Sequence, residues 1–400
     1  MVAILYFWPG MNHIFLVCIV VFSTAVTIVF YCYVIFPAIL SVLAGRKKQP
    51  DAINSDLIPV SILISAYNEE SVIRSKLESI LNSDYPESML EILIGSDGST
   101  DRTNEIVSEM SLKHASLKLV DFKERRGKPS VINDLVRESH YDVVVLTDAN
   151  VLFERQNLKK LLRNFRKKDV GLVGANILNV GLQRKGISHQ EKSYIERENL
   201  IKYREGEIWG CMMGPFGGCF ALRKELFEVI PSHFLVDDFY ISMKVLDKGY
   251  KCINDLEAIC YEDVSTDIRE EYRRKARISA GNFQNLNAFR HFLFRPFTPV
   301  GFCFISHKVI RWYTPFFILL SLISLIFLST DNHIFQVLLV GECLILLSPL
   351  IDFVCGKLGM HFTILRFVAY FTYMNLALLM GYIRYKKGVR SGVWTPTRRV

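Results

Sequence analysis

Charge is absent from the start of the chain. Residues 1–45 contain no Asp, Glu, Lys or Arg, and about 20 apolar residues suffice to cross a bilayer as a helix. No basic segment precedes the apolar run 13–43 and no small-residue cleavage site is obvious, which favours a retained anchor over a signal peptide. Arg46, Lys47 and Lys48 follow directly, so the positive-inside rule places the N-terminus outside and the next segment in the cytoplasm.

The sequence also lacks the cysteine patterns of metal-binding proteins and the strong positive charge of nucleic-acid-binding proteins. The nine cysteines contain no Cys-x-x-Cys pair and no His-Cys metal spacing, and scattered cysteines of this kind are typical of a reduced, cytosol-facing protein. The net charge is only +8. We attribute this excess to lysine and arginine beside membrane segments, and expect no nucleic-acid partner.

Apolar residues make up 50% of the chain, but they are unevenly placed. The stretch 291–311 mixes aromatic and basic residues, which is typical of a helix at a membrane interface. The chain beyond it contains three apolar candidate spans, 312–329, 334–354 and 367–383. The second carries Glu342 and Asp352, which we expect to face other helices or the interface.

This distribution of apolar and charged residues divides the chain into four expected parts. We expect an N-terminal transmembrane anchor over 1–45, a cytosolic domain over 46–290, an interfacial region over 291–311, and C-terminal transmembrane helices with a basic tail over 312–400. Three crossings after a cytoplasmic domain would leave the tail outside. The tail nevertheless carries Arg384, Lys386, Lys387, Arg390, Arg398 and Arg399, which the charge rule places inside. Either one apolar segment is re-entrant or interfacial, or the charge rule fails here.

Strand and helix patterns alternate between residues 58 and 150. Apolar strand patterns occupy 59–65, 90–95, 117–120 and 143–146, and helix patterns occupy 69–81, 101–113 and 128–139. Further helix patterns cover 154–168, 239–248 and 267–289. Repeated strand–helix–strand units of this length predict an α/β fold with a parallel, doubly wound sheet.

Acidic residues follow three of these strands. Glu69 follows the first, Asp97 the second, and Asp148 the fourth, with Asn150 two residues later. Singly, each suits a turn or a helix cap. Because the carboxyl ends of parallel strands share one edge of the sheet, these groups should meet there, where like charges repel unless a cation is present. The pattern predicts a divalent cation that neutralises a diphosphate.

Basic residues can face the same edge. Lys128 begins a helix after Arg125-Arg126-Gly127, so it and the helix N-terminus can meet a phosphate. Arg274 and Arg277 are three residues apart on another expected helix, hence on one face. For Lys128 and the residues before it, the alternative is a basic turn exposed to solvent. For Arg274 and Arg277, the alternative is a stripe of charge on the protein surface.

Several motifs in a fixed order resemble family-2 glycosyltransferases, specifically the membrane-bound group similar to cellulose and hyaluronan synthases. They are Ser65-Ala66-Tyr67-Asn68-Glu69-Glu70, Asp97-Gly98-Ser99-Thr100-Asp101, Gly127-Lys128, Thr147-Asp148-Ala149-Asn150, Asp237-Asp238, Arg274-x-x-Arg277-Ile278 and Ser306-His307-Lys308 with Arg311-Trp312. The resemblance runs from about residue 58 to 312. It implies a type-A glycosyltransferase fold (Rossmann-like) and an inverting mechanism. It also implies a nucleotide-diphosphate sugar, most commonly a UDP-sugar, and Mg²⁺ or Mn²⁺.

The resemblance also implies residue roles. Ala66, Tyr67, Glu69 and Asp97 would hold the nucleoside, and Lys128, Arg274 and Arg277 would contact the rest of the nucleotide sugar. Asp148 and Asn150 would contact the metal, and Asp238, beside Asp237, would be the general base. Elementary chemistry agrees, because a displacement at the anomeric carbon needs a base for the acceptor proton and charge stabilisation on the departing diphosphate.

Two motifs depart from the family pattern. Asn150 replaces the usual second carboxylate, and Arg274 and Ile278 replace the Gln and Trp of the synthase motif. The second change tilts the prediction towards single or limited transfer rather than processive polymerisation.

We therefore expect a multi-pass enzyme of the plasma (inner) membrane with a cytoplasmic catalytic domain. It would transfer sugar to a growing polysaccharide or a lipid-linked acceptor in envelope or exopolysaccharide synthesis. The alternatives are single transfer to a polyprenyl or lipid acceptor, and a non-catalytic nucleotide-binding membrane protein or transporter. The intact Asp238 argues against a non-catalytic binding protein and against a transporter.

Overall fold

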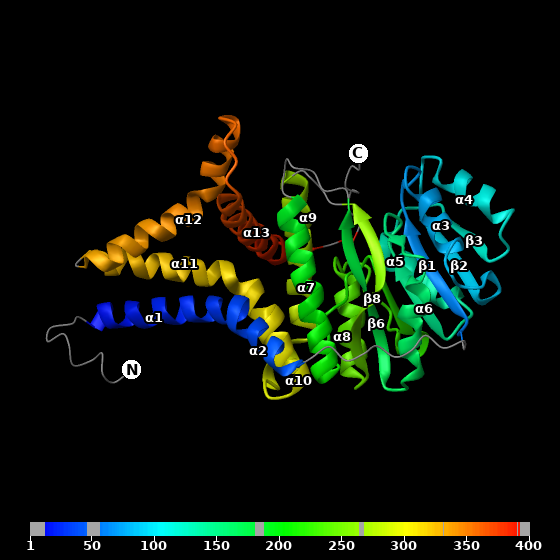
Figure 1. The fold of residues 1–400 in the computed structure, drawn as a ribbon, viewed down its shortest axis with the longest axis horizontal. Coiled ribbons are helices and arrows are strands. Elements are labelled where there is room, and N and C mark those ends of the chain that lie inside the picture. The colour runs from blue at the N-terminus through cyan, green and yellow to red at the C-terminus, as the bar shows by residue number, and fades with distance from the viewer. Residues whose placement is uncertain are drawn as a thin grey trace.

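The computed structural model describes residues 13–45, 57–180, 188–263, 268–330, 332–389 and 391–392. The basic residues Arg46, Lys47 and Lys48, most of the expected linker 49–57, and Arg390, Arg398 and Arg399 of the tail lie outside the described residues. Figure 1 shows a sheet domain on one side and a group of long helices on the other, with α7 and α9 between them.

The centre of the sheet domain is one mixed sheet of eight strands with the order β3-β2-β1-β4-β7-β6-β8-β5. The strands are β1 Val60–Ala66, β2 Leu90–Asp97, β3 Leu117–Phe122, β4 Val143–Thr147, β5 Leu152–Phe153, β6 Val170–Val180, β7 Cys219–Arg223 and β8 Lys251–Asp263. The first four are parallel, which confirms the predicted parallel arrangement of these strands. The second half is mixed, because β7 runs antiparallel to both β4 and β6.

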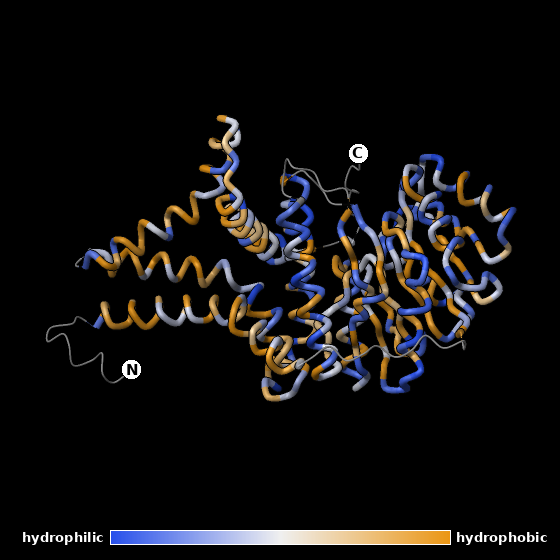
Figure 2. The backbone as a smooth tube through the Cα atoms, in the orientation of Figure 1, coloured by the Kyte–Doolittle hydropathy of each residue, from blue (hydrophilic) through white to orange (hydrophobic). Residues whose placement is uncertain are grey.

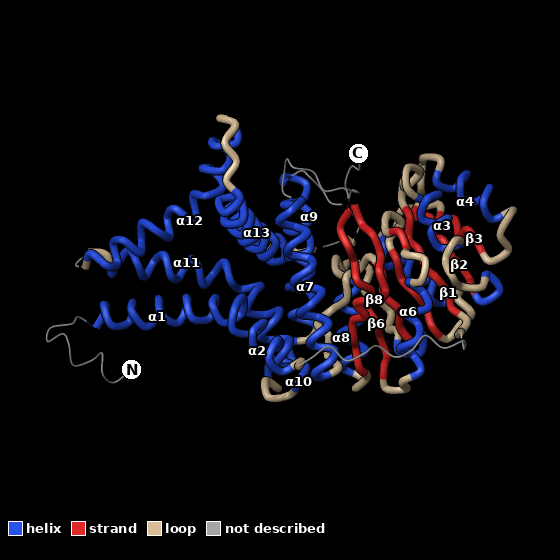
Figure 3. The backbone as a smooth tube through the Cα atoms, viewed as in Figure 1, coloured by secondary structure: helices blue, strands red, loops and turns tan. Residues whose placement is uncertain are grey.

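Helices cover both faces of the sheet (Figure 3). They are α3 Ile73–Leu81, α4 Thr103–Ser111, α5 Lys128–Glu138, α6 Asn157–Leu162 and α8 Asp237–Asp247, with the short turns η3 Glu87–Met89, η4 Arg163–Arg166 and η5 Lys224–Leu226. Helix α3 begins later than expected because residues 69–72 form a turn. The other predicted helices are present within a few residues of their expected bounds.

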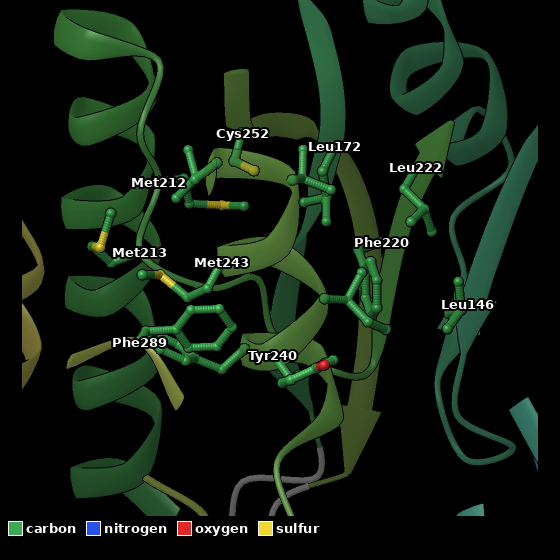
Figure 4. Packing of buried hydrophobic residues seen from close by; sticks show 14 of the residues in the cluster. Leu146, Leu172, Met212, Met213, Phe220, Leu222, Tyr240, Met243, Cys252 and Phe289 are labelled. Carbon is green, nitrogen blue, oxygen red and sulfur yellow. The ribbon is translucent and has the colours of Figure 1, made fainter. Parts of the chain in front are cut away.

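Alternation along β4 divides the core into two clusters. Val144 and Leu146 join the cluster that includes α5 and α8, whereas Val143 and Val145 join the one that includes α3, α4 and α6. Successive side chains of a strand point to opposite faces, so β4 is buried on both sides as its apolar run predicted. In Figure 4, Leu146 lies beside Phe220 of β7 on the face that Met243 of α8 covers.

Two long polar helices separate the sheet from the apolar helices: α7 Ser188–Trp209 and α9 Ile268–Ala288. Helix α9 was predicted, and α7 was not. One face of α7 carries Glu191, Ile195, Glu198, Lys202 and Glu205, and all five are buried. Their spacing of four and three residues is helical. Because these positions are mostly charged, α7 shows no apolar periodicity in the sequence.

Within the described residues, four helices are long and apolar enough to cross a membrane: His13–Leu43, Pro299–Leu328, His333–Lys357 and Thr363–Lys386. They comprise α1 His13–Phe30, η2 Tyr31–Ile35, α2 Phe36–Leu43, α10 Pro299–Cys303, η7 Phe304–Val309, α11 Ile310–Leu328, α12 His333–Lys357 and α13 Thr363–Lys386. Helices α1, α11 and α12 are the apolar group away from the sheet in Figure 2. The expected interfacial stretch 291–311 is not one separate helix, because η6 Arg290–Phe294 precedes a helix that begins at Pro299 and continues into α11.

The last described segment returns to the sheet domain. Helix α13 packs against α9, where Ser279 donates a hydrogen bond from Oγ to the carbonyl oxygen of Leu378 at 2.8 Å. A methyl group added at Gly381 would lie 2.3 Å from Cβ of Ser279, so the two helices are in close contact. Farther on, a methyl group at the buried Gly392 would lie 2.5 Å from the carbonyl oxygen of Ser232.

Candidate active site

A cavity of about 990 Å³ lies at the carboxyl ends of β1, β2 and β4 and extends to the apolar helices. Ten of the eleven predicted site residues line it: Tyr67, Glu69, Asp97, Lys128, Asp148, Asn150, Asp237, Asp238, Arg274 and Arg277. Ala66 is the exception, since its side chain packs in the second core cluster. Ser65 and Tyr67 line the cavity instead, as the two-residue period of β1 requires. Only the backbone of Ala66 is left to contact a nucleoside.

Asp97 organises the turn that precedes α5. Its carboxylate accepts hydrogen bonds from the backbone N–H groups of Arg126 at 2.7 Å and of Gly127 at 2.9 Å. Gly127 has a φ of +88°, which glycine adopts without steric cost. The guanidinium of Arg125 lies 3.6 Å from the ring centre of Tyr67. This end of the cavity therefore combines a flat aromatic surface with a buried carboxylate.

Lys128 joins two of the predicted acidic groups. Its Nζ donates a hydrogen bond to Oδ1 of Asp148 at 2.7 Å and lies 3.7 Å from Oδ2 of Asp237. Burial disfavours the charged form, but the attraction of Asp148 and Asp237 outweighs it and raises the pKa of Lys128. The first residue of α5 is therefore a permanent cation between two acidic segments that are far apart in the sequence.

Asp238 is an acid with a raised pKa. It lies in the first turn of α8, and its Oδ1 accepts a hydrogen bond from the N–H of Phe239 at 2.7 Å. Burial and the neighbouring Asp237 raise the pKa of Asp238 to about 6, against the opposing effect of Lys128. A methyl group at Gly217 would lie 2.9 Å from Oδ2 of Asp238, so the Gly-rich loop 214–218 approaches this carboxylate closely. A carboxylate with a pKa near neutrality is suited to accept a proton.

Two arginines of α9 reach the same cavity. Arg274 lies 3.3 Å from Glu271, which is the main cause of its raised pKa. Arg277 donates a hydrogen bond to the carbonyl oxygen of Leu235 at 3.3 Å. Burial and the repulsion of Arg274 lower the pKa of Arg277 to about 10, so it remains charged at neutral pH. The predicted common face of the two arginines is confirmed.

Three further residues at this site were not predicted. Glu262 at the end of β8 accepts a hydrogen bond from Nδ2 of Asn150 at 3.3 Å. The buried Lys76 of α3 donates to Thr147 and to the carbonyl oxygen of Val151, on both sides of the Asp148 segment. Lys202 of α7 lines the cavity. No short motif marks these three positions, because each comes from a different element. Only folding brings Glu262 and Lys202 to the cavity and Lys76 to the Asp148 segment.

The oxygen donors of Asp148 and Asn150 fit a divalent cation. Within the described parts of the chain, no cluster of three or more His, Cys, Asp or Glu residues could hold a metal by itself. Mg²⁺ commonly takes only one or two carboxylates from the protein and completes its shell with water and substrate phosphates. The residues present therefore suit a cation that binds together with a diphosphate.

This α/β sheet, with acidic groups converging at its carboxyl edge and with long apolar helices attached, has counterparts among known structures. A mannosyltransferase from Pyrobaculum calidifontis, solved in complex with GDP-Man and Mn²⁺, matches 92% of this chain and 99% of its own with a TM-score of 0.69 at 20% identity. At this identity the likeness shows the fold alone. The predicted type-A glycosyltransferase fold is confirmed.

Sequence comparison finds relatives for part of the chain. Residues 61–230 match the model of glycosyl transferase family 2. A probable glycosyltransferase, YdaM of Bacillus subtilis (strain 168), is 28% identical over 241 residues, which are 57% of this chain and 56% of the relative. A poly-beta-1,6-N-acetyl-D-glucosamine synthase of Staphylococcus epidermidis is 25% identical over 232 residues, 57% of this chain and 55% of the relative. The chain thus spans little more than half the length of these relatives. It carries a glycosyl transferase family 2 domain over residues 61–230, and its described residues include four candidate membrane-spanning helices.

Proposed function

We propose that the protein is a multi-pass, inverting glycosyltransferase of the plasma (inner) membrane with a cytoplasmic catalytic domain over 46–290. It transfers a sugar from a nucleotide-diphosphate sugar to a glycan or lipid-linked acceptor. The observation that carries the proposal is the convergence of Asp148, Lys128 and Asp238 on one cavity. This arrangement supplies charge stabilisation for a departing diphosphate and a proton acceptor for the incoming hydroxyl.

The donor occupies the carboxyl edge of the sheet in this proposal. Tyr67, Glu69 and Asp97 hold the nucleoside, while Lys128, Arg274 and Arg277 contact the phosphates and the sugar. Asp148 and Asn150 hold Mg²⁺ or Mn²⁺, which neutralises charge on the diphosphate. The Mn²⁺ and GDP-Man in the mannosyltransferase structure support a divalent cation and a nucleotide sugar, and we take UDP as the nucleotide to test first.

Asp238 acts as the general base. Its carboxylate accepts the proton of the acceptor hydroxyl while that oxygen bonds to the anomeric carbon, and the bond to the donor diphosphate breaks. Asp237, which lies 3.7 Å from Lys128, orients that lysine. A pKa of about 6 for Asp238 leaves most of it ionised at neutral pH.

Two acceptor classes are open within this function. The name poly-beta-1,6-N-acetyl-D-glucosamine synthase of one relative favours chain extension in an envelope or extracellular polysaccharide. Ile278, at the place of the Trp in the synthase motif, lines the cavity, and it favours a single or limited transfer to a lipid-linked acceptor.

The test uses membranes that contain the protein, a panel of radiolabelled nucleotide sugars, and Mn²⁺ or Mg²⁺. Label in high-molecular-weight, glycosidase-sensitive material would identify a synthase, and label in solvent-extractable lipid would identify a single-transfer enzyme. Asp238→Asn should remove the incorporation in both cases. Incorporation that is unchanged in Asp238→Asn would contradict the assignment of the base.

A further inference from the structure

On the polar face of α7, all but one of the charged side chains form ion pairs with side chains of the surrounding helices. Glu191 contacts Lys275 at 3.1 Å, and Glu205 contacts His307 at 2.7 Å. Glu198 is shared by His307 at 2.8 Å, Lys308 at 2.6 Å and Arg311 at 2.8 Å. The remaining charged position of this face is Lys202.

Lys202 is a buried amine without a polar partner among the described residues. Only 3% of it is exposed, and its Nζ lies 3.4 Å from the ring centre of Phe216. It lines the cavity that also holds Asp238. Burial and the repulsion of Lys308 lower the pKa of Lys202 to about 7. Since burying a cation without hydrogen bonds is unfavourable, a ligand that supplies an acceptor would stabilise the charged form of Lys202.

The surroundings of Lys202 favour an anion. Lys308 and Arg311 line the same part of the cavity, and both are paired with the one carboxylate of Glu198. The acids near Lys202 are Glu198, Glu205 and Asp238. Glu198 and Glu205 are already engaged by His307, Lys308 and Arg311, so neither is left to pair with Lys202. Phosphate oxygens are strong acceptors for such donors.

The wall beyond these cations comes from the apolar helices. Tyr33, Trp312, Tyr370, Met374 and Leu378 complete the lining there, and all five belong to the candidate membrane spans. A cationic site that opens onto aromatic and apolar side chains matches an amphiphile with an anionic head. Helix α12 has only Ser348 buried, so little of its surface packs against the other described helices.

We propose that Lys202, with Lys308 and Arg311, binds the phosphate of a lipid-linked sugar that serves as the acceptor. This inference rests on the proposed function and names its acceptor class. The sugar hydroxyl of the lipid faces Asp238, loses its proton to that carboxylate and bonds to the anomeric carbon of the donor. The donor's bond to its diphosphate breaks, and the nucleoside diphosphate leaves with the electron pair.

The test measures lipid binding in the absence of any nucleotide sugar, with the full chain in nanodiscs. The probes are a polyprenyl-diphosphate-linked monosaccharide, the same sugar on a neutral polyprenol, and inorganic phosphate, with dissociation constants from native mass spectrometry. Lys202→Met should weaken binding of the phosphate-bearing lipid about tenfold or more, as expected for a lost ionic hydrogen bond. It should leave the neutral lipid unaffected. Lys202→Arg should retain most of the affinity.

A matched control lies on the same helix. Lys192 pairs with Glu196 at 3.7 Å and does not line the cavity, so Lys192→Met should bind like the wild type. Equal binding of the phosphate-bearing lipid by Lys202→Met and the wild type would overturn the proposal. Equal weakening for the phosphate-bearing and neutral lipids would also overturn it. Binding of inorganic phosphate as tight as that of the lipid would show a site for free phosphate and would overturn the lipid assignment.

Stability separates a ligand site from a structural role. Removing a buried cation that has no polar partner should leave the unfolding temperature of Lys202→Met equal to or above that of the wild type. A clear fall would assign Lys202 to the fold and overturn the proposal. Because lipid binding is measured without donor, Lys202-dependent binding together with absent sugar transfer would contradict the proposed function and leave the lipid site standing.

Discussion

Lys76 donates a hydrogen bond from Nζ to Oγ1 of Thr147 at 2.8 Å, inside the protein and directly before Asp148. The same ammonium donates to the carbonyl oxygen of Val151. Burial lowers the pKa of Lys76 to about 8. One buried side chain of α3 therefore holds both ends of the segment that carries Asp148 and Asn150.

Lys76→Met should loosen this segment. The carbonyl of Val151 would lose its donor, and a buried acceptor left unsatisfied costs about 1–3 kcal/mol. We expect a lower unfolding temperature and a weaker affinity for Mn²⁺, measured by thermal unfolding and by metal titration in the presence of nucleotide. Lys113→Met is the control, since Lys113 is an exposed partner of Glu109. Unchanged metal affinity in Lys76→Met would contradict the positioning role.

Asp148→Ala should abolish sugar transfer. The substitution removes the carboxylate that we assign to the metal and also a partner of Lys128. EDTA should stop turnover of the wild-type enzyme, and added Mn²⁺ or Mg²⁺ should restore it. The exposed Asp169, paired with Lys251, gives the control Asp169→Ala. Full activity of the wild type in EDTA would refute the metal-dependent mechanism.

The rate of transfer should fall in acid with an apparent pKa of about 6. Asp238 has this pKa because burial and Asp237 disfavour its charged form, and a general base works only when deprotonated. kcat/KM should therefore rise with pH up to about 7 and then level off. At pH 5 it should be about a tenth of the plateau value. A profile that is flat from pH 5 to pH 8 would exclude Asp238 as the base.

Gly217→Ala should impair catalysis more than stability. The added methyl group would lie 2.9 Å from Oδ2 of Asp238, and the carboxylate would have to move. A displacement of about 1 Å can cost on the order of a hundredfold in rate, so we expect kcat to fall at least tenfold. Gly341→Ala is the matched control, because nothing lies within 4 Å of its added methyl group. Wild-type kcat in Gly217→Ala would show that the loop does not constrain Asp238.

The sequence predicted the donor side of the site because its signals are local. The strands β1, β2 and β4 are apolar runs that end at polar residues, and parallel pairing alone brings Asp97 and Asp148 to one edge. Lys128 and Arg277 were found because each stands in a short motif. Ala66 was assigned by its motif, yet the two-residue period of β1 turns its side chain into the core.

The acceptor side was missed for a physical reason. Helix α7 buries Glu198, Lys202 and Glu205, and a buried stripe of charged residues looks in the sequence like a solvated surface. The partners of Glu198, which are His307, Lys308 and Arg311, are more than a hundred positions away. Their pairing depends on how the apolar helices dock on the sheet domain, which no local pattern encodes.

The contact of Gly392 with the sheet domain restricts how many times the chain can cross a membrane between these two parts. Two chain segments that touch outside the bilayer must be separated by an even number of crossings. Three candidate spans lie between α9 and Gly392, so they do not all cross. Helix α13 packs along α9 through Ser279, and we infer that it is the candidate span that remains on the side of the sheet domain. With two crossings, Arg384, Lys386 and Lys387 would lie on the same side as the sheet domain, as the charge rule requires.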